Sequence, residues 1–159
     1  MYKRQVIDPF MFKFGSLVVE LSRLTGLIFI NTSVDSVKPI ERSVRRMLYC
    51  HNTHQYQTRD FLYAKILLLV VNLQEIEKYD KDLLDVCKKQ LLGSINDNEY
   101  FGARFEISTT ALLIRKGGQF KKRESPDFLV QAEKAVFLEC TSCHISASPD
   151  TAGVKASML

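Results

Sequence analysis

Two carboxylates at the ends of short apolar runs are the residues of this chain whose type and spacing could do chemistry. Asp127 precedes the apolar run at residues 128–130, and Glu139 follows the apolar run at residues 135–138. Mg2+ prefers oxygen ligands and is usually held by one or two carboxylates together with substrate phosphate oxygens. An Asp and a Glu on neighbouring strands could therefore hold Mg2+ or Mn2+ beside a phosphate group.

The two apolar runs are predicted to be β-strands that position these carboxylates. Residues 135–138 are β-branched and aromatic in part, which is typical of a buried strand, and residues 128–130 form a shorter run of the same kind. Pro126 suits the position before a strand, where its missing N–H costs little. Residues 131–134 are polar enough to turn, which favours a hairpin. A hairpin would bring Asp127 and Glu139 towards the same end of the sheet.

Together with the segment that precedes them, these residues resemble the PD-(D/E)XK nuclease superfamily, which has the restriction-endonuclease-like fold. In that pattern a helix that carries a glutamate precedes a strand hairpin. Glu106 matches the helix position, Pro126-Asp127 matches the PD, and Glu139 matches the acidic residue of (D/E)XK. The resemblance covers residues 98–143, less than a third of the chain. It implies an α+β protein with an α-β-β-β core, abbreviated because twenty residues follow Glu139.

The resemblance also implies a function, that of a metal-dependent nuclease acting on nucleic acid. Asp127 and Glu139 would bind Mg2+ or Mn2+, and Glu106 would be a third catalytic carboxylate that assists through water. The lysine of the family falls on Thr141, which cannot supply a cation. Lys134 or Lys155 could project a replacement ammonium. The alternative is a non-catalytic nuclease-fold module that binds nucleic acid or a protein partner.

Basic residues gather just before the candidate metal site, on both sides of a Gly-Gly pair. They are Arg115, Lys116, Lys121, Lys122 and Arg123. Such a cluster could grip phosphates, with an affinity that falls steeply with salt. The net charge of +4 is compatible with a nucleic-acid partner, DNA in particular. A homodimer would supply the two active sites that a double-strand cut requires.

A second basic stretch occurs on a predicted helix nearer the N-terminus and consists of Arg42, Arg45 and Arg46. These charges are either a second set of phosphate contacts or ordinary solvated helix charges.

Cys140, Cys143 and His144 form a C-x-x-C-H motif, the spacing that attaches c-type haem. The first residues do not resemble a signal peptide, which argues against haem attachment. Zinc binding by the same residues would need a fourth ligand, and no other cysteine or histidine has ligand-pair spacing with a further cysteine. The four cysteines show no disulfide framework, which favours a reduced, cytoplasmic setting. No apolar stretch reaches the roughly 18 residues of a membrane span, so no membrane partner is expected.

Residues 1–95 are predicted to be a helical region and residues 96–159 the nuclease-like core. Apolar spacing predicts helices over residues 14–30, from Pro39 to Tyr49, from Thr58 or Asp60 to Tyr79, and over residues 82–92. The turn-forming residues at 93–98 are the predicted linker, and Asn96 to Asn98 could cap the next helix. In that helix, Phe101, Phe105, Thr109 and Leu112 lie on one face, which is predicted to face the core.

Overall fold

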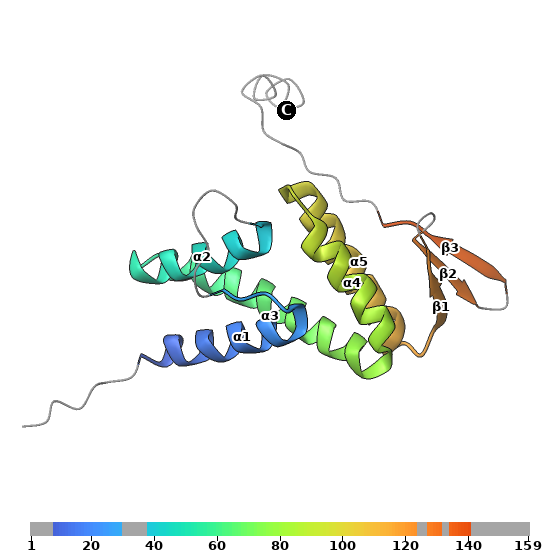
Figure 1. Ribbon diagram of the computed structural model, residues 1–159, viewed down its shortest axis with the longest axis horizontal. Helices are drawn as coiled ribbons and strands as arrows, with labels where there is room; N and C mark the ends of the chain where they lie inside the picture. The colour runs from blue at the N-terminus through green and yellow to red at the C-terminus, as the bar shows by residue number, and fades with distance from the viewer. Residues whose placement is uncertain (1–7, 30–37, 124–126, 132–133, 141–159) are drawn as a thin grey trace, which may run out of the picture.

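The computed structural model describes residues 8–29, 38–123, 127–131 and 134–140, which form a mostly helical α+β protein with a small sheet (Figure 1). The helices are α1 (Pro9–Thr25), α2 (Pro39–Asn52), α3 (Tyr56–Tyr79), α4 (Lys81–Gly93) and α5 (Asp97–Arg115). The strands are β1 (Gln119–Lys122), β2 (Phe128–Gln131) and β3 (Ala135–Leu138). In the described part of the chain, no helix is long and apolar enough to cross a membrane.

Local capping signals set several helix ends. The Asp8 carboxylate accepts a hydrogen bond from the N–H of Phe10 at 2.8 Å, so α1 begins at Pro9, earlier than the apolar spacing predicts. It ends before Gly26, whose φ of 75° lies in the left-handed region that glycine tolerates. The prediction that α2 begins at Pro39 is confirmed. The prediction of a cap for α5 is also confirmed, because the Asn96 side chain accepts from the N–H of Glu99 at 2.9 Å.

Helix α3 is the centre of the hydrophobic core and contacts all four other helices. The core consists mainly of aliphatic side chains from every helix, and its fully buried members include Leu21, Ile40, Met47, Leu73, Ile76, Leu91 and Ile107. Helix α5 contributes to this same core through Tyr100, Ala103, Ile107 and Ala111. The helical core therefore extends across the 95/96 position.

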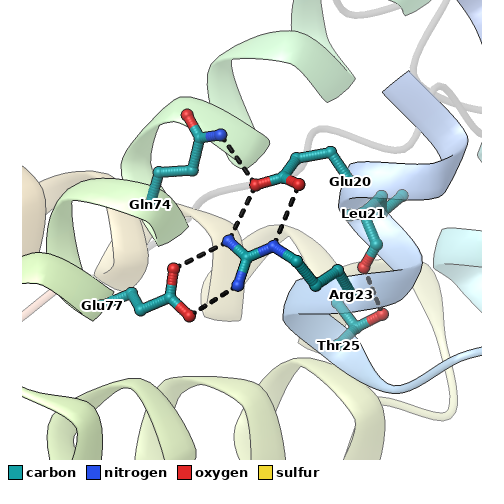
Figure 2. Close-up of polar contacts among 6 residues, drawn as sticks. All are labelled: Glu20, Leu21, Arg23, Thr25, Gln74 and Glu77. Carbon is teal, nitrogen blue, oxygen red and sulfur yellow. Dashed lines mark hydrogen bonds and ion pairs between the residues drawn. The ribbon is translucent and has the colours of Figure 1, made fainter. Parts of the chain in front are cut away.

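A polar cluster also joins α1 to α3 (Figure 2). The Arg23 guanidinium donates to both oxygens of Glu77 at 2.7 Å and to both oxygens of Glu20. Gln74 Nε2 donates to Glu20 Oε1 at 2.8 Å. Hydrogen bonds from Arg23 and Gln74 lower the pKa of Glu20 to about 2.

The predicted core face of α5 is wrong. Phe105 and Leu112 are each 49% exposed. The buried face of α5 is instead a stripe that consists of Tyr100, Ala103, Ile107, Thr110 and Ala111. Both stripes have helical spacing, and the stripe with small residues packs against α3 because alanine and threonine allow close approach of the two helices.

The three strands form one antiparallel sheet in the order β1-β2-β3. Phe128 on β2 is fully buried, and its ring meets Phe120 on β1 edge to face at 6.0 Å between centroids. Phe120 in turn stacks on Tyr79 at the end of α3 at 6.1 Å. The prediction that 135–138 is a buried strand is wrong, because β3 is an edge strand of the described sheet and Phe137 is 57% exposed.

Candidate functional site

The predicted hairpin is confirmed, and it brings Asp127 and Glu139 to one end of the sheet. Strands β2 and β3 pair with Phe128 opposite Leu138, so the two acidic residues each lie one position beyond that pair. Asp127 Oδ2 accepts a hydrogen bond from the N–H of Cys140 at 2.5 Å. This bond ties the Asp127 side chain to the residue that follows Glu139.

The third predicted carboxylate, Glu106, is bonded from two sides. One oxygen accepts from Gln90 Nε2 on α4 at 2.5 Å, and the other pairs with the Lys122 ammonium on β1. The Glu106 and Lys122 side chains are only 13% and 9% exposed. Lys122 Nζ also lies 5.0 Å from the centroid of the buried Phe128 ring. The pair therefore joins the sheet to α4 and α5.

A pocket of about 1050 Å³ lies between α4, the edge of β1 and the end of α3. Its lining includes Glu106, Lys122 and Asp127 together with the exposed Lys121 and Arg123. The fold thus brings two of the three predicted catalytic carboxylates and three of the predicted phosphate contacts to one cavity. Glu139 does not line this cavity and is exposed beside it.

The donors at the hairpin end suit Mg2+ only as a two-carboxylate site. Asp127 and Glu139 offer the carboxylate oxygens that Mg2+ prefers, and one or two such ligands are usual for a site completed by phosphate and water. Both oxygens of Glu106 are already engaged by Gln90 and Lys122. Among the residues described, no group of three or more His, Cys, Asp or Glu could hold a metal ion. Glu106 is accordingly placed to hold Lys122.

The other predicted basic residues divide into two groups. Lys116, Lys121 and Arg123 are exposed. Arg115 is also exposed, but it pairs with Glu75 at 2.5 Å and donates to the side-chain oxygen of Asn72, which joins the end of α5 to α3. Arg115 is thus committed to a helix–helix contact.

The structure bears on only one of the two lysines, Lys134 and Lys155, that could replace the lysine of the PD-(D/E)XK pattern. Lys134 directly precedes Ala135, which pairs with Gln131, so Lys134 lies at the end of the hairpin opposite Asp127. Lys155 and Thr141 lie outside the described residues, as does Pro126. Three lysines share the pocket with Asp127, namely Lys89, Lys121 and Lys122, and Lys122 is the one that pairs with Glu106. The sequence does contain a signal for the position of Lys122. Phe120 and Lys122 are two residues apart in a strand, so their side chains lie on the same face of the sheet.

Most of the C-x-x-C-H motif, including Cys143 and His144, lies outside the described residues. Cys140 is a free cysteine whose Sγ is 3.5 Å from Thr109 Oγ1, and burial raises the pKa of its thiol. Cys87 is fully buried, and burial raises the pKa of its thiol to about 11. These environments favour the neutral thiol over the thiolate that metals and electrophiles require.

In chemical terms the hairpin end combines two oxygen donors, a neighbouring ammonium and exposed cations. This combination suits a phosphate-containing substrate with a divalent cation. Comparisons of the chain with protein-family models, with curated proteins and with solved structures found no match.

Proposed function

We propose that the protein is a metal-dependent phosphodiesterase that acts on nucleic acid, with a restriction-endonuclease-like core formed by α5 and the three strands. The observation that carries the proposal is the end of the β2–β3 hairpin, where Asp127 and Glu139 flank the last strand pair and a lysine shares a pocket with Asp127. The order helix, strand, strand, strand, with a glutamate on the helix, also supports it.

In this proposal Asp127 and Glu139 hold Mg2+ or Mn2+, and the bound ion supplies the positive charge that polarises the phosphodiester. The N–H of Cys140 fixes one oxygen of Asp127 and leaves the other for a ligand bond. Fixing a carboxylate in this way reduces the entropy lost when a ligand binds.

Lys122 takes the role of the family's lysine in this proposal. Its ammonium stabilises negative charge on the phosphate, and Glu106 holds the ammonium in place from the helix side. Glu106 is therefore a positioning residue. Lys121 and Arg123, which are exposed at the pocket, bind neighbouring phosphates and give the salt dependence expected of backbone contacts.

One observation favours a second candidate function, a nuclease-fold module that binds nucleic acid without cleaving it. The Lys122 ammonium is paired with Glu106 and is largely buried. A lysine committed to a structural pair would leave the pocket able to bind phosphates but not to promote their cleavage.

A divalent-cation titration with plasmid and single-stranded DNA tests the first proposal. Asp127→Ala and Glu139→Ala should each lose cleavage and Mn2+ binding. Lys122→Met should lose cleavage but keep Mn2+ binding, since both metal ligands remain. Asp85→Ala is the matched control, because Asp85 is an exposed carboxylate on α4 that does not line the pocket.

The outcomes separate the two candidates. Cleavage that persists in both carboxylate variants would refute the assigned metal ligands. Absence of cleavage and of Mn2+ binding by the unaltered protein, with salt-sensitive DNA binding in EDTA, would establish the non-catalytic module.

A further inference from the structure

A second pocket lies on the other side of α5 from the candidate metal site. It has a volume of about 500 Å³ and is enclosed by α2, the first half of α3 and the first turns of α5. A volume of this size is within the range of small-molecule sites. None of its lining residues lines the pocket that contains Asp127.

The walls of this pocket carry an excess of positive charge. Four cations line it, Arg42, Arg46, Lys65 and Arg104, against a single carboxylate, Asp97. Asp97 is paired with Arg42 at 3.0 Å. Within the described part of the chain, the other three cations form no salt bridge with a carboxylate. Among the described residues, the pocket thus gathers three positive charges that no carboxylate pairs with.

Two of these cations are held close together. Arg104 Nη2 donates to the backbone oxygen of Lys65 at 3.1 Å, which fixes its guanidinium group. Lys65 Nζ lies 4.2 Å from the centroid of the Phe61 ring. Burial and the nearby charge of Arg104 lower the pKa of Lys65. Two like charges held together in this way repel each other, and an anion between them would relieve the repulsion.

The pocket also contains a buried hydroxyl without a well-aligned hydrogen bond and an accessible aromatic ring. Tyr100 is 2% exposed, and its hydroxyl makes no well-aligned hydrogen bond with the described residues, although burial raises its pKa by more than an interaction with the Ser43 side chain lowers it. Phe61 is 58% exposed at the same pocket and offers a surface on which a planar ring can stack.

We propose that this pocket binds a phosphate group together with its adjoining nucleobase, supplied either by a free nucleotide or by a nucleic-acid strand. Arg46, Lys65 and Arg104 take the phosphate, because guanidinium and ammonium groups form strong charge-assisted hydrogen bonds with phosphate oxygens. The nucleobase packs on Phe61. The inference does not depend on the proposed nuclease activity, since it uses different residues and requires no metal ion.

Fluorescence anisotropy in EDTA tests the proposal with a labelled oligothymidylate, with unlabelled AMP and ATP as competitors. Arg46→Gln and Lys65→Met should each weaken binding about tenfold, the effect expected when one charged hydrogen bond is lost. Lys13→Gln is the control, because Lys13 is an exposed cation on α1 away from the pocket. Arg46 is itself exposed, so its replacement should leave the fold intact, which thermal unfolding checks.

Either source of the ligand would support the proposal. Competition by AMP or ATP would identify a free nucleotide, and binding of the oligonucleotide alone would identify a strand. The proposal is overturned if adenosine, which lacks phosphate, binds as tightly as AMP. It is equally overturned if neither probe binds, or if both pocket variants bind like the Lys13 control.

Discussion

Replacing Glu106 by glutamine should destabilise the protein strongly, because it leaves the Lys122 ammonium buried without a counter-charge. The side chains of this pair are 13% and 9% exposed, so solvent screens them little. Glu106 also accepts from Gln90, and a glutamine offers one acceptor oxygen where the carboxylate offers two. We expect the free energy of unfolding to fall by about 3 kcal/mol, the lower part of the range for breaking a buried pair.

The partner substitution, Lys122→Met, keeps an apolar stem against Phe128 but leaves the Glu106 carboxylate with Gln90 alone. It should also cost about 3 kcal/mol. The double variant Glu106→Gln with Lys122→Met removes both charges and restores a neutral contact with Gln90, so its stability should lie within about 1 kcal/mol of the unaltered protein. The single costs sum to about 6 kcal/mol, which gives a coupling energy of about 5 kcal/mol.

Urea unfolding followed by circular dichroism measures these differences, with equal m-values required for the comparison. The exposed pair of Lys88 and Asp85 on α4 provides a control cycle, for which the coupling should be below about 1 kcal/mol. If Glu106→Gln lowers the free energy of unfolding by less than about 0.5 kcal/mol, the pair is exposed to solvent. That result would refute the buried position of Lys122 and with it the proposed role of Glu106 in holding the ammonium.

Three further predictions concern single groups. The Cys87 thiol, with a pKa raised by burial to about 11 from 9.0, should contribute stability below pH 9 that is lost as the pH rises towards 11. The loss should reach about 2 kcal/mol, and Cys87→Ala should remove it from the pH dependence of urea unfolding; an unchanged alkaline slope would contradict this. The pKa of Glu20 is lowered from 4.5 to about 2, so its contribution is present above pH 4.5 and lost as the pH falls towards 2. Thermal unfolding should show that Glu20→Gln abolishes this acid loss, about 1 kcal/mol after solvent screening, whereas an equal acid loss in the variant would show that other carboxylates cause it. Tyr100→Phe removes a buried hydroxyl that makes no well-aligned hydrogen bond and should raise the free energy of unfolding by about 1 kcal/mol; a decrease in the urea midpoint would mean that its interaction with Ser43 is a stabilising hydrogen bond.

Much of the secondary structure could be predicted from the sequence because its signals are local. Pro39 starts α2 and Asn96 caps α5 as the sequence indicates, and the polar segment between two apolar runs does form a hairpin. The buried face of α5 could not be chosen in this way. Two stripes of residues have the same helical spacing, and only the packing of α3 decides that Ile107 is buried and Phe105 is not.

The candidate site shows the same division between local and long-range information. Asp127 and Glu139 lie at the same end of the sheet because β2 and β3 form a hairpin. The short segment between the two strands is enough to predict that hairpin. The Glu106–Lys122 pair depends on how β1 returns along α4 and α5, and no motif spacing encodes that path. The second pocket, the cationic pocket lined by Arg46, Lys65 and Arg104, combines side chains from three helices. The sequence alone therefore could not distinguish the basic stretch on α2 from solvated helix charges.

Helix α5 contributes residues to both proposed sites, but it contributes different residues to each. Arg104 and Glu106 are two residues apart, which turns their side chains about 200° from each other around the helix axis. One therefore lines the cationic pocket while the other holds Lys122 beside Asp127. Substituting Arg46 or Lys65 should reduce binding of a nucleic-acid substrate and leave Mn2+ binding intact, whereas substituting Asp127 should do the reverse. Loss of both properties from a single substitution in either pocket would show that α5 couples the sites, because no side chain is shared between them.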